Sequence, residues 1–134
     1  SMGGYGAFKL ALGAPELFCA GASLSGALDI AGSIQERLLG NPQYWTSIFG
    51  DIAQLKNSPN DLFRLAEDCK ARGLMPRLYQ CCGTEDVMYA QNVKMRDFLQ
   101  SLGYDLTYEE SKGGHEWGFW DEKIQSVLHW WSKK

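Results

Sequence analysis

The order of the expected elements predicts an α/β fold in which a parallel sheet is flanked by helices. Helical segments alternate with short strands along the whole chain, which is the arrangement that builds parallel sheets. The first expected strand, over residues 18–24, is a short apolar run of the kind that is buried on both faces of such a sheet.

The expected strands cover residues 18–24, 77–82 and 106–109. A parallel sheet this small has exposed edges and makes a poor fold on its own. We therefore expect residues 1–134 to be the C-terminal portion of a single domain whose N-terminal half is absent.

The expected helices cover residues 2–14, 58–73, 89–102 and 120–131. Gly13 and Pro15 end the first of them, and Gly103 ends the third. Ser58 is the expected N-cap of the second helix, with Pro59 in its first turn.

Residues 25–57 show neither a clean helical period nor a clean strand period. They contain several glycines and the aromatic residues Tyr44, Trp45 and Phe49. So long a connection inside a compact domain usually has a function of its own. We interpret it as a cap-like insertion over a site.

Composition excludes several classes of protein. The chain is 45% hydrophobic and 22% charged, which is typical of a globular protein and not of a disordered one. Its net charge is −3, whereas a nucleic-acid binder typically carries a clearly basic surface. No apolar run is long enough to span a bilayer, so we expect neither nucleic acid nor a membrane as a partner.

The cysteines are Cys19, Cys69, Cys81 and Cys82, and their spacing matches no metal-binding motif. We expect no metal site, and we interpret the cysteines as reduced, buried thiols of a cytoplasmic protein. Since Cys81 and Cys82 are adjacent in a strand, their side chains should point to opposite faces of the sheet.

The chain opens with Ser1-Met2-Gly3, directly before a helix. This is the second half of the G-x-S-x-G nucleophile elbow, in which a serine lies at a sharp turn from strand to helix. Small residues around such a serine let the strained backbone pack closely. The motif is short, and a serine added in cloning is the alternative interpretation of Ser1.

Two downstream residues favour the nucleophile interpretation. Asp86 follows the strand over residues 77–82, and His115 lies in the loop after the last strand. Both positions are at carboxyl ends of parallel strands, where open α/β sheets build their sites. The order Ser, Asp, His is that of a hydrolase triad on an α/β sheet. Glu85 is the alternative acid, and an ordinary turn aspartate is the alternative interpretation of Asp86.

Each of these residues has a chemical role in the predicted triad. Ser1 would be the nucleophile, and His115 would be the base that takes its proton. Asp86 would hold the imidazole tautomer and stabilise the imidazolium. The backbone N–H of Met2 would be one donor of the oxyanion hole, with the other coming from chain that precedes residue 1.

Other residues are open to two interpretations. Trp45 and Trp117 are candidates for an apolar substrate pocket, with local packing as the alternative for each. Glu116 is either a solvated loop acid or a group that orients the histidine. His129 lies within the last expected helix, where packing or surface exposure is the simpler explanation. Ser23 and Ser25 are expected at a strand end, either as ordinary strand-end residues or as part of the lining of the site.

Four segments carry a resemblance to a known family: Ser1-Met2-Gly3-Gly4-Tyr5-Gly6-Ala7, Ala22-Ser23-Leu24-Ser25-Gly26, Cys82-Gly83-Thr84-Glu85-Asp86 and Gly113-Gly114-His115-Glu116-Trp117. The chain resembles the putative esterase family of α/β-hydrolases, which includes tributyrin esterases, feruloyl and acetyl-xylan esterases, and S-formylglutathione hydrolases. The last segment, with Phe119-Trp120-Asp121, is most similar to the tributyrin and acetyl esterase branch. The resemblance runs through essentially the whole chain, and the family's N-terminal half is missing.

The resemblance implies hydrolysis of short-chain acyl esters by a triad of Ser1, Asp86 and His115, without a metal or organic cofactor. An S-formylglutathione hydrolase-like thioesterase is the alternative within enzymes. The alternative of another class is a non-catalytic fragment that is stable only as a homo-oligomer or with a partner chain, because its sheet would have an exposed edge.

Overall fold

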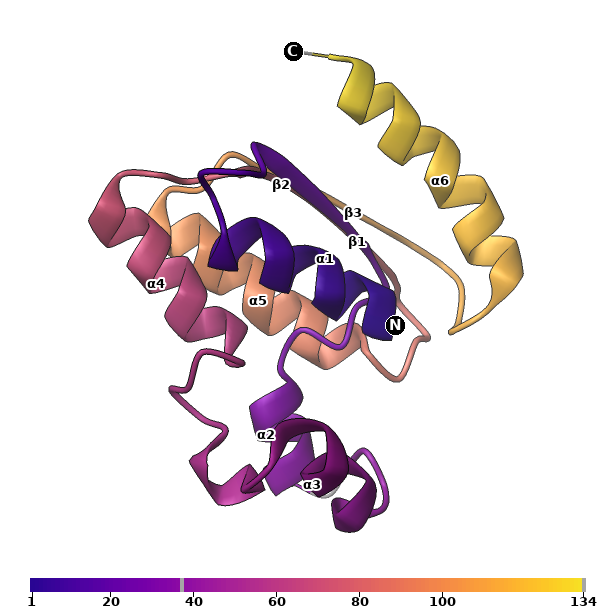
Figure 1. Ribbon diagram of the computed structural model, residues 1–134. Coiled ribbons are helices and arrows are strands. Elements are labelled where there is room, and N and C mark those ends of the chain that lie inside the picture. The colour runs from indigo at the N-terminus through magenta and orange to yellow at the C-terminus, as the bar shows by residue number, and fades with distance from the viewer. Residues whose placement is uncertain (37, 134) are drawn as a thin grey trace.

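The computed structural model describes residues 1–36 and 38–133, and it has the predicted α/β architecture. Strands β1 (Ala20–Leu24), β2 (Arg77–Gly83) and β3 (Leu106–Ser111) form one parallel sheet in the order β1-β2-β3. Helices α1 (Met2–Gly13), α4 (Leu62–Arg72) and α5 (Tyr89–Leu102) cover one face. Of the described helices, α6 (Trp117–Ser132) covers the other face (Figure 1).

The central strand β2 is buried on both faces, as an apolar strand of a parallel sheet should be. Leu78 and Cys82 belong to the core beneath α1, α4 and α5. Tyr79 and Cys81 pack instead in a smaller cluster with Phe119, Val127 and Trp130 of α6. The vicinal cysteines therefore point to opposite faces, as predicted.

The thiols are not all buried. Cys69, Cys81 and Cys82 are buried, whereas Cys19 is exposed just before β1, and all four are free. The expectation of uniformly buried cysteines is wrong for Cys19, because β1 begins at Ala20 and not at residue 18.

Two helix starts differ from the prediction. Asp61, not Ser58, caps α4: its carboxylate accepts hydrogen bonds from the N–H of Phe63 (3.1 Å) and of Asn57 (2.8 Å). The Ser58 hydroxyl accepts from Asn60 N–H, within a turn that precedes the helix. Helix α6 begins at Trp117, three residues earlier than expected, and its first turn therefore follows His115 almost directly.

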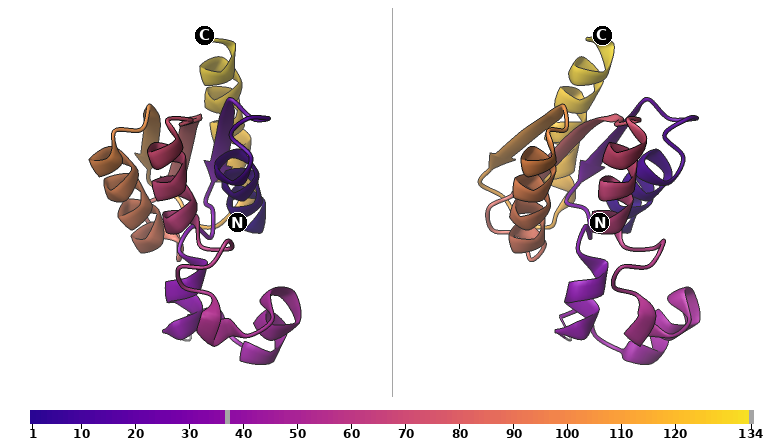
Figure 2. Two further views of the ribbon diagram at one scale, coloured as in Figure 1. Left: turned by 60° about the vertical axis from the view of Figure 1, so that its left-hand side comes forward. Right: turned by 90° about the vertical axis from the view of Figure 1, so that its left-hand side faces the viewer.

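The segment over residues 25–57 contains short helices that its sequence did not reveal. They are α2 (Ile30–Gln35), α3 (Pro42–Phe49) and the 3₁₀ turn η1 (Ile52–Gln54). At six and eight residues, α2 and α3 are too short to build up a visible period. Figure 2 shows the segment projecting beyond the end of the body at which α1 begins.

None of the helices in the described ranges combines the length and the apolar character needed to cross a membrane.

Candidate active site

Ser1 is held at the carboxyl end of β1. Its α-amino nitrogen donates a hydrogen bond to the carbonyl of Leu24 (3.0 Å), and its own carbonyl accepts one from Ala27 N–H (3.1 Å). Ser1 occupies the N-cap position of α1, yet its hydroxyl makes no capping hydrogen bond. The hydroxyl is therefore not committed to the helix, unlike that of an ordinary N-cap serine.

The close approach around Ser1 depends on Gly4 rather than on Gly3. A Cβ at Gly4 would lie 2.4 Å from Ser23 Oγ and 2.7 Å from Gly26 Cα, whereas one at Gly3 would meet nothing within 4 Å. The first turn of α1 thus packs directly on the loop after β1. Among the described residues, the small residue near Ser1 that permits close packing is therefore Gly4.

Asp86 and His115 form a direct pair. The Nδ1 atom of His115 lies 3.1 Å and 3.0 Å from the two carboxylate oxygens of Asp86. The Asp86 side chain is fully buried, while that of His115 keeps 29% of its surface exposed. The carboxylate also accepts a hydrogen bond from Met88 N–H (2.8 Å), which fixes it within the turn after β2. A buried carboxylate that holds one imidazole nitrogen leaves the other nitrogen free to act as a base.

The loop that carries His115 crosses very close to the end of β2. Glu85 N–H donates to the carbonyl of Gly113 (3.0 Å). A Cβ at Gly83 would lie only 2.1 Å from that carbonyl oxygen. The absence of a side chain at Gly83 is therefore what lets the histidine loop reach the turn of Asp86.

An aromatic pair borders the histidine. The indole of Trp120 packs edge-on to the His115 ring, with centroids 4.8 Å apart, and Trp117 packs edge-on to Trp120. Trp120 Nε1 donates a hydrogen bond to Ser25 Oγ (3.0 Å). Sequence reasoning missed this bond, since Ser25 and Trp120 lie 95 residues apart and no motif connects them.

A cavity of about 440 Å³ opens beside Ser1. Its lining is mostly small and apolar: Ser1, Gly3, Gly4, Ala22, Leu24, Trp117 and Trp120. Trp117 therefore lies where a substrate pocket residue was predicted. Trp45 does not: its indole is buried, stacks on Phe49 and donates to the carbonyl of Leu39, all within the projecting segment.

The sequence and the fold both match known esterases. The family model described as "Putative esterase" matches residues 1–130. This chain belongs to that esterase family. An acetyl esterase of Caldicellulosiruptor saccharolyticus is 35% identical over 139 residues, which cover 99% of this chain and 52% of the relative.

Solved structures agree with the family assignment. An S-formylglutathione hydrolase of Staphylococcus aureus has a TM-score of 0.84 at 28% identity, over 97% of this chain and 51% of that protein. A fluorophosphonate-binding serine hydrolase of the same organism has a TM-score of 0.85 at 28% identity, with the same coverage. A ferulic acid esterase has the same fold, with a TM-score of 0.69 at 22% identity over 96% of this chain and 46% of that protein. The chain spans about half the length of these relatives.

Within the described part of the chain, the predicted triad residues meet only in part. Asp86 and His115 are paired, and Ser1 lies at the same end of the sheet, but no hydrogen bond joins the Ser1 hydroxyl to His115 in residues 1–36 and 38–133. Catalytic hydrogen bonds of this kind are often long before substrate binds.

The alternative acids lie elsewhere. Glu85 is exposed and faces Lys112 at 4.0 Å. Glu116 is exposed at the N-cap of α6 and makes no side-chain capping bond. His129 is exposed in the last turn of α6, away from Asp86.

Cys82 is another nucleophilic side chain near the pair, and its surroundings disfavour a thiolate. Burial and, after it, the nearby carboxylate of Asp86 together raise the pKa of the Cys82 thiol to about 12. Because the thiolate is the nucleophilic form, Cys82 is unsuited to attack a substrate at neutral pH. In the ranges that the structure describes, no group of three or more His, Cys, Asp or Glu side chains is placed to hold a metal ion.

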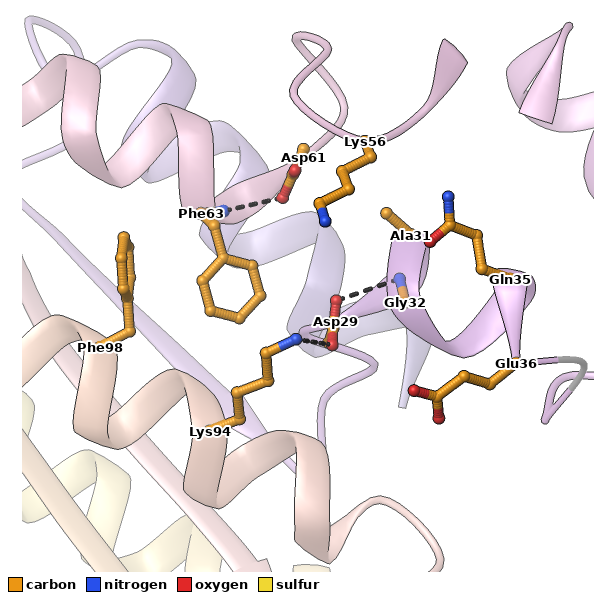
Figure 3. A pocket seen from close by; sticks show the side chains of 10 residues that line it. All are labelled: Asp29, Ala31, Gly32, Gln35, Glu36, Lys56, Asp61, Phe63, Lys94 and Phe98. Carbon is orange, nitrogen blue, oxygen red and sulfur yellow. Dashed lines mark hydrogen bonds and ion pairs between the residues drawn. The ribbon is translucent and has the colours of Figure 1, made fainter. Parts of the chain in front are cut away.

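A second cavity, of about 610 Å³, lies apart from this site between α2, α4 and α5 (Figure 3). Lys94 pairs there with Asp29 at 2.6 Å. Asp29 and Asp61 each cap a helix, so their carboxylates already have structural partners. The cavity shares no lining residue with the one beside Ser1, and it contains none of the triad candidates.

Proposed function

We propose that this protein is a serine esterase that hydrolyses short-chain carboxylic esters through an acyl-enzyme on Ser1. The pairing of the buried Asp86 carboxylate with His115 Nδ1 carries the proposal, because it is the acid–base half of a triad. The position of Ser1 at the same end of the sheet and the membership of the esterase family support it.

The reaction follows from these groups. His115 Nε2 takes the proton of Ser1 Oγ as that oxygen attacks the ester carbonyl. Asp86 keeps Nδ1 protonated and stabilises the imidazolium. The tetrahedral intermediate collapses when His115 returns the proton to the leaving alcohol. Water then attacks the acyl-Ser1 ester in the same way, and the carboxylic acid and free Ser1 are released.

The N-terminus of α1 supplies one part of the oxyanion hole. The first N–H groups of a helix have no intrahelical acceptor. The Ser1 carbonyl accepts from Gly4 N–H (3.2 Å), which leaves the N–H of Met2 for the oxyanion of the intermediate. The positive end of the α1 dipole lies at the same place and favours that negative charge.

The cavity beside Ser1 indicates the substrate class. Its walls carry almost no polar groups besides Ser1 itself, so it suits a small acyl group better than a charged one. An acetyl esterase among the relatives points to the same class. The mechanism uses only groups of the polypeptide and calls for no cofactor, and the free thiols favour a cytoplasmic location.

A thioesterase acting on S-formylglutathione is the second candidate, because the S. aureus hydrolase of that name matches this fold at 28% identity. The same triad would attack a thioester. The third candidate, a non-catalytic fragment stable only in an oligomer or with a partner chain, predicts no turnover at all.

The test compares p-nitrophenyl acetate, butyrate and octanoate with S-formylglutathione, using the full natural polypeptide that carries this sequence. We expect the acetate or butyrate ester to give the highest kcat/KM, and Ser1→Ala to abolish turnover. The matched control is Ser101→Ala, since the Ser101 hydroxyl is exposed and donates to the carbonyl of Phe98 at the far end of α5. A strong preference for the thioester would favour the second candidate. Turnover that survives Ser1→Ala would overturn the proposed nucleophile.

A further inference from the structure

The side chain of Asn92 is fully buried in the first turn of α5, and every polar atom of its carboxamide is used. Its Nδ2 donates to the carbonyls of Gly26 (2.9 Å) and Met88 (3.0 Å). Its Oδ1 accepts from Gln80 Nε2 (3.1 Å). One side chain thus connects β2, the turn after β2 and the loop after β1.

The two carbonyls that Asn92 binds belong to the loops that hold the proposed nucleophile and acid. Met88 donates its N–H to the carboxylate of Asp86 (2.8 Å). Gly26 precedes Ala27, whose N–H donates to the carbonyl of Ser1 (3.1 Å). A short path of hydrogen bonds and peptide units therefore runs from Asp86 to Ser1, and its centre is the carboxamide of Asn92.

Both loops are irregular, so their positions depend on such side-chain bonds. Ser25, next to Gly26, has a φ of 50°, a left-handed conformation that is costly for a residue with a side chain. Asp86, Val87 and Met88 form the turn between β2 and α5 and lie in neither element. Without Asn92, the carbonyls of Gly26 and Met88 would lose a buried donor that is common to both loops.

The polar network around Asn92 is not optimal for stability. Gln80 is also fully buried, and its Oε1 has no hydrogen-bond partner in the described ranges. A buried acceptor without a partner destabilises the folded state. A well-packed apolar pair at positions 80 and 92 would avoid that cost, which favours a role for the network other than stability.

We propose that Asn92 is a positioning residue that sets the spacing between the Ser1 backbone and the Asp86 turn. The inference rests on the proposed function, since it assigns Asn92 to the same triad. Asn92 touches neither substrate nor the reacting atoms. It acts through Gly26 and Met88, and its loss moves the acid and the nucleophile relative to each other.

The test is the substitution Asn92→Ala in the full natural polypeptide, with Asn92→Ser as a milder variant if the first does not fold. We expect kcat for p-nitrophenyl acetate, per active site titrated with a fluorophosphonate, to fall roughly 10- to 100-fold, with KM changed less than about twofold. Tyr104→Phe is the matched control. It removes another buried hydrogen bond, to the carbonyl of Ala66 (2.7 Å), far from the triad, so it should lower stability and leave kcat unchanged.

A second readout does not need turnover. The proton between His115 Nδ1 and Asp86 should give a downfield proton NMR signal, assigned by its loss in His115→Asn. We expect Asn92→Ala to shift or broaden this signal and Tyr104→Phe to leave it unchanged. A folded Asn92 variant with unchanged kcat per titrated site and an unchanged signal would overturn the inference. An inactive wild type would count against the proposed function, while the signal would still decide the role of Asn92.

Discussion

The indole nitrogen of Trp120 donates a 3.0 Å hydrogen bond to the hydroxyl of Ser25, which is buried at the end of β1. This bond joins the start of α6 to the loop that holds Ser1. The same indole packs against the His115 ring, so Trp120 is in contact with both halves of the site. Trp120 therefore connects the loop that carries His115 with the loop after β1 that contacts Ser1, although the two loops are far apart in the sequence.

We expect Trp120→Phe to lower the free energy of unfolding by about 1–2 kcal/mol, because the aromatic packing on His115 remains while the buried Ser25 hydroxyl loses its donor. Urea denaturation measures this loss. The matched control is Trp131→Phe, an exposed tryptophan of the same helix, which should change stability by less than about 0.5 kcal/mol. Equal effects of the two substitutions would argue against a special role for the Ser25 bond.

The sequence predicted the sheet and the Asp86–His115 pair because both follow from the order of elements along the chain. Polar residues after parallel strands gather at one end of the sheet, so their meeting needs no knowledge of packing. The Trp120–Ser25 bond and the hydrogen bonds of Asn92 depend on how α5 and α6 pack against the sheet. No local sequence pattern predicts that packing. Trp45 was assigned to the pocket because an aromatic residue in a long connection looks like a cap residue, whereas its indole is buried in the hydrophobic core and donates to the carbonyl of Leu39.

The cap of α4 shows the limit of capping motifs. Ser58 followed by Pro59 predicts a helix start, yet the carboxylate of Asp61 satisfies two backbone N–H groups and fixes the start three residues later. We expect Asp61→Ala to cost about 1–2 kcal/mol and Ser58→Ala less than about 0.5 kcal/mol, both measured by thermal or urea unfolding. A larger loss of stability for Ser58→Ala than for Asp61→Ala would show that Ser58, not Asp61, caps α4.

Thiol reactivity should distinguish Cys19 from the other cysteines. Cys19 is exposed, whereas burial raises the pKa of Cys81 to about 11 and that of Cys82 to about 12, and also raises that of Cys69. Brief alkylation of the folded protein, mapped by peptide mass spectrometry, should modify Cys19 and spare the other three. Rapid labelling of Cys81 or Cys82 would contradict the buried placement of β2.

The same pKa values give the pH dependence of stability a direction. A thiol whose pKa is raised by folding stays protonated in the folded state at pH values where the unfolded chain ionises it. Its contribution is complete below the unfolded value of about 9 and is lost as the pH rises toward 11–12. We expect the free energy of unfolding to fall between about pH 9 and pH 11. Replacing Cys82 with alanine should make this fall less steep.

Both the fold and the site depend on the absence of a side chain at Gly83. Its missing Cβ would lie 2.1 Å from the backbone oxygen of Gly113, and backbone cannot move aside as a flexible side chain can. Gly83→Ala should therefore push the loop of His115 away from Asp86. We expect a loss of at least about 2 kcal/mol in the free energy of unfolding, and a fall in kcat that is larger than the change in KM.

Gly6→Ala is the matched control for this substitution. A Cβ at Gly6, in the middle of α1, meets nothing within 4 Å, so alanine should stabilise the helix by roughly 0.5–1 kcal/mol. If Gly83→Ala folds with unchanged stability and turnover, the close crossing of the two backbones is not what holds His115 beside Asp86.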